Sequence, residues 1–152
     1  MQYFTKSIVL QEVPNEISLA FTVAGCPNNC KNCSWKNTIE KYPLFELTND
    51  LFENLIQKYV GYVSCILFMG GEWCEDLIDK LRISKKNNFK TCLYTGLELK
   101  YVKDEILSNL DYIKTGRYIE ELGGLDNPNT NQKFIDLNTG QILNEHFSNR
   151  DI

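Results

Sequence analysis

The chain has 152 residues, of which 43% are hydrophobic and 24% charged, and its formal net charge is −4. This length favours a single domain over residues 1–152, and the acidic balance argues against nucleic acid as a partner, because phosphate binding needs clustered Lys and Arg. The longest apolar run covers only residues 65–69, and the first residues lack the apolar stretch of a signal peptide. We therefore expect a cytoplasmic protein without a membrane partner.

The first part of the chain begins with a predicted β-hairpin. Residues 7–11 and 17–23 have strand patterns, and the Pro-Asn pair between them is a turn signal. The second of these strands leads directly into a loop that contains three cysteines. After this loop, apolar residues recur at helical spacing over 47–60, where Thr48 or Asn49 is the expected N-cap.

The middle of the chain alternates between strands and helices, an order typical of parallel βαβ units. Eight such units need about 250 residues, so the chain is too short for a closed barrel. The sequence therefore predicts an α/β fold built as a partial, open barrel. The predicted strands cover 64–69, 89–94 and 111–115, and the predicted helices cover 73–86 and 98–110.

The last part of the chain has a different character. Residues 116–132 are polar and rich in turn-forming residues. Residues 133–143 have the pattern of two short strands around an Asn-Thr-Gly turn. We therefore predict a long loop followed by a C-terminal hairpin.

Three of the six cysteines, Cys26, Cys30 and Cys33, follow the second strand with the spacing C-x3-C-x2-C. In a cytosolic protein, cysteines serve metal or redox chemistry more often than disulfides. A structural zinc site usually has four ligands, and a four-iron cluster normally has four cysteines. Three cysteines would leave one iron open for a substrate or cofactor. An iron–sulfur cluster is therefore the favoured interpretation, and the alternative is a zinc knuckle or three unrelated thiols.

A second motif follows the next predicted strand, where Gly70, Gly71 and Glu72 occur in sequence. Glycines at a strand end let a ligand approach the backbone closely, and a carboxylate there can accept hydrogen bonds from an ammonium group. On its own, such a triplet is more often a simple strand-to-helix turn. Thr95 and Gly96 end the following strand in a similar position.

The other three cysteines, Cys65, Cys74 and Cys92, fall on or beside predicted strands. Buried free cysteine is common in such places, so packed thiols are the expected role. Cys74 lies just after the Gly-Gly-Glu triplet and is therefore close to the candidate site along the chain.

The two motifs together resemble the radical S-adenosylmethionine superfamily, whose barrel carries C-x3-C-x2-C after its first strand and a Gly-Gly-Glu-like motif after its second. The resemblance implies that Cys26, Cys30 and Cys33 hold a [4Fe–4S] cluster whose open iron binds S-adenosylmethionine. It further implies that the triplet from Gly70 to Glu72 binds the amino group of the methionine part.

The resemblance also identifies further cofactor contacts. Many members have an aromatic residue immediately before the third cysteine, whereas this chain has Asn32. Backbone groups from Asn32 to Ser34 are then the expected contacts to adenine. Thr95 and Gly96 resemble the Tyr-Thr-Gly strand end of one subfamily and are further candidates.

The segment 111–134 is similar to the tail of activating components of anaerobic ribonucleotide reductase, with Thr115 in place of a common Asp. The matching positions are Asp111, Gly116, Arg117, Tyr118, Asn131 and Gln132. This resemblance implies an electron from reduced flavodoxin or ferredoxin, reductive cleavage of S-adenosylmethionine to a 5′-deoxyadenosyl radical, and hydrogen abstraction from a glycine of a large glycyl radical subunit. An activase of the pyruvate formate-lyase type, a small-molecule radical enzyme and a non-catalytic zinc module remain alternatives.

Overall fold

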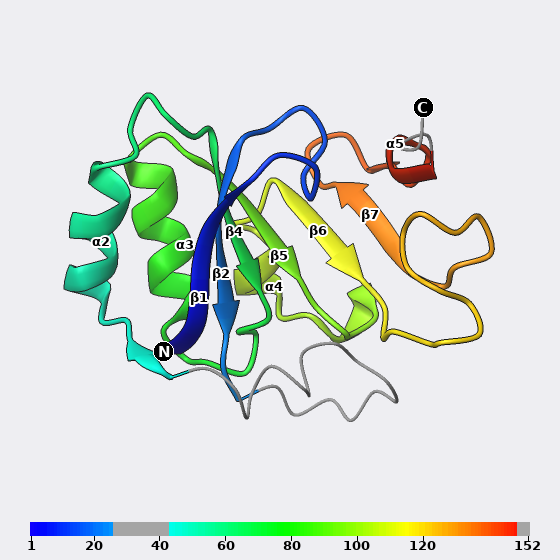
Figure 1. Ribbon diagram of the computed structural model, residues 1–152, viewed down its shortest axis with the longest axis horizontal. Coiled ribbons are helices and arrows are strands. Elements are labelled where there is room, and N and C mark those ends of the chain that lie inside the picture. The colour runs from blue at the N-terminus through cyan, green and yellow to red at the C-terminus, as the bar shows by residue number, and fades with distance from the viewer. Residues whose placement is uncertain (26–42, 149–152) are drawn as a thin grey trace.

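The computed structural model describes residues 1–25 and 43–148, and these form one curved sheet with helices packed against it (Figure 1). The strand order in the sheet is β3-β1-β2-β4-β5-β6-β7-β8. The strands are β1 (Gln2–Val9), β2 (Ser18–Val23), β3 (Phe45–Glu46), β4 (Cys65–Met69), β5 (Lys90–Tyr94), β6 (Tyr112–Thr115), β7 (Lys133–Asp136) and β8 (Gln141–Ile142).

The sheet is mixed. Its centre is parallel, since β2 pairs with β4, β4 with β5, and β5 with β6 in the same direction. Both flanks are antiparallel, with β3, β1 and β2 on one side and β6, β7 and β8 on the other. Within the described residues the sheet does not close on itself, and a barrel of the radical S-adenosylmethionine type remains a prediction.

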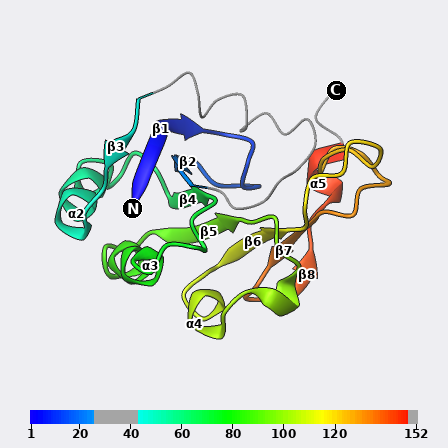
Figure 2. The same ribbon diagram turned by 90° about the horizontal axis from the view of Figure 1, so that it is seen from below.

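Helices α2 (Asn49–Gln57), α3 (Leu77–Lys86) and α4 (Asp104–Leu107) cover the outer, convex face of the sheet (Figure 2). The N-cap of α2 is Thr48, as predicted, and its side chain accepts a hydrogen bond from the backbone N–H of Leu51. A short helix, α5 (Glu145–Ser148), lies on the other side of the sheet (Figure 2).

The predicted helix over 98–110 is wrong, because the structure divides this segment into two pieces. A single 3₁₀ turn covers Leu99–Tyr101, and α4 begins at Asp104. Val102 and Lys103 between them have extended backbone. This break carries the Val102 side chain into the core, where it is buried with Ile106. Burial of Val102 against the sheet therefore outweighs the local helical periodicity.

The predicted helix over 73–86 begins later than expected, at Leu77. The strand-end contacts of Trp73 and Glu72 hold the preceding residues in turns, since Trp73 donates a hydrogen bond to the backbone of Ala24 and Glu72 accepts one from Thr95. The first predicted strand begins earlier than expected, because its residues from Tyr3 onward pair with β2 and Gln2 pairs with β3.

The core has two apolar layers, one on each face of the sheet. Along β4, Ile66 and Phe68 belong to the layer under the helices, whereas Cys65 and Leu67 belong to the layer on the concave face. This alternation follows from the two-residue period of a strand. In the helix-side layer the rings of Phe21, Phe52 and Phe68 contact one another at centroid distances of 5.6–5.7 Å.

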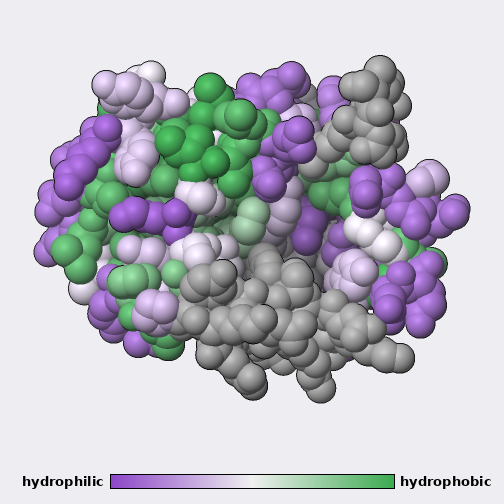
Figure 3. Space-filling view, viewed as in Figure 1, coloured by the Kyte–Doolittle hydropathy of each residue, from purple (hydrophilic) through white to green (hydrophobic). Residues whose placement is uncertain are grey.

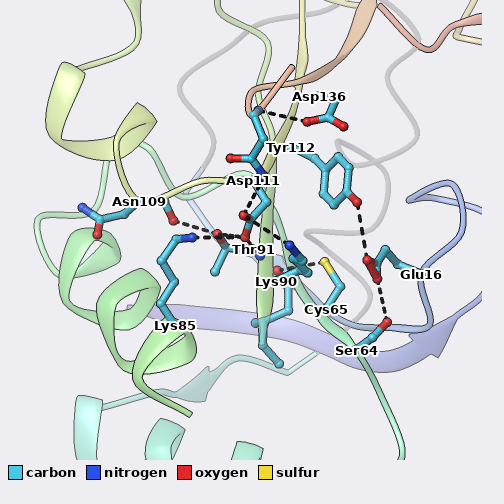
Figure 4. A network of polar contacts seen from close by, with 12 residues as sticks. Glu16, Ser64, Cys65, Lys85, Lys90, Thr91, Asn109, Asp111, Tyr112 and Asp136 are labelled. Atoms are coloured by element: carbon cyan, nitrogen blue, oxygen red, sulfur yellow. Dashed lines mark hydrogen bonds and ion pairs between the residues drawn. The ribbon is translucent and has the colours of Figure 1, made fainter. Parts of the chain in front are cut away.

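The parallel strands define two edges with different chemistry. At the edge where they begin, the Asp111 carboxylate accepts hydrogen bonds from the backbone N–H of Thr91 at 2.9 Å and from Asn138 Nδ2 at 3.1 Å, and Lys85 Nζ lies 3.2 Å away (Figure 4). These contacts join two strands, α3 and a loop. The predicted site residues lie at the other edge, where the parallel strands end. In open α/β sheets, ligands bind at this carboxyl-terminal edge.

Apolar side chains are exposed over the beginnings of β2 and β4, in the upper part of Figure 3. They include Ile8, Leu10, Ile17 and Val60. This surface lies at the edge opposite to the Gly-Gly-Glu triplet and is therefore separate from the candidate site. None of the helices in the described residues has the length and apolar character needed to cross a membrane.

Candidate functional site

The predicted cluster ligands and their neighbours lie outside the described residues. These are Cys26, Cys30, Asn32, Cys33 and Ser34. What the structure describes is the two ends of the segment that contains them, residues 24–25 and 43–47, together with the strand ends beside it.

The entry to the cysteine segment is held on two sides at Ala24. Its backbone N–H donates to the Gln2 carbonyl oxygen at 2.9 Å, and its carbonyl oxygen accepts a hydrogen bond from Trp73 Nε1 at 3.0 Å. Gly25 follows with a φ of 87°, in the left-handed region that favours glycine. The chain therefore turns sharply one residue before Cys26.

The exit of the segment is bound to the same N-terminal strand. Phe45 and Glu46 form β3, which pairs with Tyr3 and Gln2 of β1. The backbone N–H of Leu47 donates to the Met1 carbonyl oxygen at 2.9 Å. Both ends of the cysteine segment thus contact residues 1–3.

The Gly-Gly-Glu triplet forms a tight turn at the end of β4, directly beside the end of β2. Gly70 and Gly71 have φ values of 85° and 113°. A Cβ on Gly70 would lie 2.6 Å from the Trp73 ring, and a Cβ on Gly71 would lie 3.4 Å from the Val23 side chain. Glycine is thus required by backbone conformation at both positions and by space at Gly70.

Glu72 ends this triplet, and only one of its two carboxylate oxygens has a hydrogen-bond partner among the described residues. Its Oε1 accepts a hydrogen bond from Thr95 Oγ1 at 2.7 Å. Its Oε2 is buried and has no hydrogen-bond partner among the described residues. Burial raises the pKa of Glu72, and the Thr95 hydrogen bond and the positive charge of Lys114 offset this only in part. A buried oxygen without a partner is costly, which points to a missing hydrogen-bond donor.

Thr95 joins this turn to the end of β5. Besides donating to Glu72, its hydroxyl oxygen accepts a hydrogen bond from the backbone N–H of Leu97 at 3.0 Å. Gly96 follows at the same edge. The structure therefore brings Gly70, Glu72 and Thr95 together at the ends of the paired strands β4 and β5.

Lys114 is a further residue near the site that belongs to none of the sequence motifs, and its positive charge acts on Glu72. Its Nζ lies 4.6 Å from the centroid of the Tyr94 ring. The available signal was the strand alternation of β6, which places Lys114 on the same face as Tyr112, a residue packed against the concave-side layer. Trp73 follows the Gly-Gly-Glu triplet directly, but no local feature of the sequence indicates its contact with Ala24.

The remaining cysteines have environments that suit packing. Burial raises the pKa of Cys65 to about 12 and raises that of Cys92 strongly, and both side chains lie in the concave-side layer, as expected of packed thiols. Burial also raises the pKa of the half-buried Cys74. Within residues 1–25 and 43–148, no group of three or more His, Cys, Asp or Glu side chains could hold a metal ion.

The two halves of the tail motif form one hydrogen-bonded unit. Gln132 Nε2 donates to the Gly116 carbonyl oxygen at 3.1 Å, and Asn131 Nδ2 donates to the Arg117 carbonyl oxygen at 3.0 Å. A Cβ on Gly116 would lie 3.2 Å from the Asn131 carbonyl oxygen, so only glycine fits well. Asp111, which the same resemblance included, instead stabilises the opposite edge of the sheet.

Comparison with known proteins gives a family for the chain. The model of the 4Fe-4S single cluster domain family matches residues 17–139, a range that includes the three-cysteine segment and the Gly-Gly-Glu turn. Comparisons with curated proteins and with solved structures found no match. The match favours an iron–sulfur cluster over a zinc site as the interpretation of the cysteine spacing. Because it covers most of the chain, the protein belongs to the 4Fe-4S single cluster domain family and is an iron–sulfur protein.

Proposed function

We propose that the protein is a radical S-adenosylmethionine activase that generates a glycyl radical on anaerobic ribonucleotide reductase. The observation that supports this most strongly is the buried Oε2 of Glu72, which lacks a partner among the described residues. Glu72 follows two glycines in the left-handed region at the end of β4. This strand pairs with β2, which leads into the cysteine segment. An ammonium group is the kind of donor that this oxygen would bind.

We assign the cluster to Cys26, Cys30 and Cys33. Thiolates are the usual ligands of a four-iron cluster, and burial raises the pKa of each of the other cysteines, which disfavours their thiolates. Three ligands leave one iron open to S-adenosylmethionine. When bound, the cluster supplies the electron that breaks the S–C5′ bond of this cofactor.

In this proposal Glu72 binds the amino group of S-adenosylmethionine and Thr95 orients the carboxylate by its hydrogen bond to Oε1. The bare backbone of Gly70 and Gly71 lets the cofactor approach closely. Gly96, at the same edge, is a further contact to the cofactor. The backbone of Asn32 and Ser34 would contact adenine.

The proposed partner is the large glycyl radical subunit of the reductase, and the electron donor is reduced flavodoxin or ferredoxin. The hydrogen-bonded unit of Gly116, Arg117, Asn131 and Gln132 supports the reductase over other glycyl radical enzymes, because these residues match the reductase-activator tail and lie together. The partial barrel, the single domain and a cytoplasmic location belong to the same proposal.

The first test is anaerobic reconstitution with iron and sulfide, followed by reduction with S-adenosylmethionine and an assay for 5′-deoxyadenosine. We expect product from the wild type and none from Cys30→Ala. Glu72→Gln should keep its cluster but need a much higher S-adenosylmethionine concentration. Glu53→Gln, on the outer helix α2, is the matched control and should behave as the wild type.

A cluster-loaded protein that makes no 5′-deoxyadenosine would contradict the proposed activity while leaving the family intact. Wild-type affinity for S-adenosylmethionine in Glu72→Gln would remove the proposed role of this carboxylate. Electron paramagnetic resonance should then detect a glycyl radical on the large reductase subunit and none on pyruvate formate-lyase. The reverse result would favour the alternative activase.

A further inference from the structure

We propose that Trp73 is a positioning residue that anchors the entry of the cysteine segment to the Gly-Gly-Glu turn, and that this contact determines how firmly the chain retains its cluster. The inference rests on the part of the proposed function that assigns the cluster to Cys26, Cys30 and Cys33. It does not depend on cleavage of S-adenosylmethionine or on the identity of a partner.

The polar contact is made by the indole nitrogen. Trp73 Nε1 donates to the Ala24 carbonyl oxygen at 3.0 Å, across 49 positions of sequence. Ala24 precedes the first proposed ligand, Cys26, by two positions. Since the Ala24 N–H donates to the Gln2 carbonyl oxygen, the residue that follows β2 is hydrogen-bonded through both its N–H and its carbonyl group.

The apolar contact is made by the six-membered ring. A Cβ on Gly70 would lie 2.6 Å from the ring carbon Cη2, so the indole occupies space that only glycine leaves free. A Cβ on Gly25 would lie 3.4 Å from Nε1. One side chain thus contacts the glycine before Cys26 and the first glycine of the turn.

The position of this anchor gives it a consequence for the cluster. Gly25 has a φ of 87° and, as a glycine, has more backbone freedom than other residues. The hydrogen bond to Ala24 and the contact of the indole with Gly25 both restrain this residue pair. They therefore limit the directions in which the chain can leave β2. Ala24 and Gly25, the described residues before Cys26, then lose less conformational entropy when a cluster binds.

The test compares iron release from reconstituted wild type, Trp73→Phe and Tyr112→Phe to an excess of ferrous chelator. Trp73→Phe keeps an aromatic ring but removes the N–H donor. Tyr112→Phe is the matched control, since it removes the hydrogen bond from Tyr112 Oη to Glu16. That bond joins residues at the opposite edge of the sheet. We expect Trp73→Phe to release iron about fivefold faster than the wild type, the effect of one net hydrogen bond. The control should match the wild type.

A spectroscopic readout separates positioning from general stability. The electron paramagnetic resonance signal of the reduced cluster should shift or broaden in Trp73→Phe and stay unchanged in Tyr112→Phe. If Trp73→Phe does not fold, hydrogen exchange of the Trp73 indole N–H in the wild type tests the anchor instead. Slower exchange with the cluster loaded than without it supports the anchor, and equal exchange overturns it.

Equal iron release and equal spectra in wild type and Trp73→Phe would overturn the inference, and so would the same acceleration in both variants. A wild type that binds no cluster would instead contradict the assignment of the cysteines. The two failures are therefore distinguishable within one experiment.

Discussion

At the scale of single residues, Glu72 has one buried carboxylate oxygen without a hydrogen-bond partner among the described residues. Burial removes water from Oε2, and no hydrogen bond among the described residues replaces it. This disfavours the charged carboxylate, so the pKa of Glu72 is raised from 4.5. A bound ammonium group would reverse this balance by favouring the charged form. The proposed binding of S-adenosylmethionine would therefore be linked to the ionisation of Glu72.

This linkage predicts a pH dependence. Below its raised pKa, Glu72 is protonated and must lose a proton before it binds an ammonium group, so affinity for S-adenosylmethionine should increase as pH rises from 4.5 through the raised pKa and then level off. The slope should be at most about tenfold per pH unit. Equilibrium dialysis of reconstituted protein measures it. Glu53→Gln should keep this slope, whereas Glu72→Gln should lose it, and a persistent slope in Glu72→Gln would assign the titration to another group.

The buried cysteines predict a second residue-scale result. Alkylation requires the thiolate, and burial raises the pKa of Cys65 to about 12 and that of Cys92 well above its usual range. Iodoacetamide at neutral pH should modify both at least about a hundredfold more slowly than a free thiol. Peptide mass spectrometry checks this, with urea-unfolded protein as the control in which both react. Rapid native labelling of Cys92 would contradict the packing described for β5.

At the scale of elements, the long loop between β6 and β7 begins and ends at one hydrogen-bonded unit. Gln132 is 4% exposed and donates to the Gly116 carbonyl oxygen, and Asn144 fixes the following strand by accepting from the Phe134 N–H and donating to the Gln132 carbonyl oxygen. Side chains thus supply the hydrogen bonds that a continuous ladder would otherwise supply.

Removal of this unit should destabilise the fold. Gln132→Ala leaves the Gly116 carbonyl oxygen without its side-chain donor, and we expect a loss of about 1–3 kcal/mol in the free energy of unfolding. Urea unfolding measures the change. Asn129→Ala, at an exposed position of the same loop, is the control and should change stability by less than about 0.5 kcal/mol. Equal stability of the two variants would mean that the loop is held by other contacts.

At the scale of the whole molecule, the stabilising contacts of Asp111 and the candidate site residues lie at opposite edges of the parallel strands. The Asp111 carboxylate joins β5, α3 and the β7–β8 turn at one edge, whereas Glu72 and Thr95 lie at the other. Burial alone would raise the pKa of Asp111. Hydrogen bonds from Asn138 and Thr91 and the charge of Lys85 outweigh this effect and lower the pKa below 3.8.

Because the pKa of Asp111 is lower in the folded chain than in the unfolded chain, its ionised carboxylate stabilises the fold. This stabilisation is fully present above the unfolded pKa of 3.8 and is lost as pH falls through the lower folded pKa. Asp111→Asn should therefore reduce the free energy of unfolding by about 2–4 kcal/mol at neutral pH. The difference from wild type should shrink below pH 3.8. Urea unfolding at several pH values measures this, with the exposed Asp126→Asn as control. A difference that does not depend on pH would assign the loss to packing instead.

The cysteine spacing, the Gly-Gly-Glu triplet at a strand end and the alternation of strands and helices follow from the sequence by itself. Each depends on residues close together along the chain, where spacing and local conformation carry the information. The match of 17–139 to a 4Fe-4S family agrees with the cysteine spacing. The helix over 98–110 does not follow in this way, because burial of Val102 outweighs the local pattern.

Only the tertiary structure decided which of these residues meet. The contact between Glu72 and Thr95 spans 23 positions and the anchor from Trp73 to Ala24 spans 49 positions. Both depend on how β2, β4 and β5 pair. No local pattern encodes such contacts, since their energy comes from burial and hydrogen bonding between segments that approach one another only after the sheet has formed.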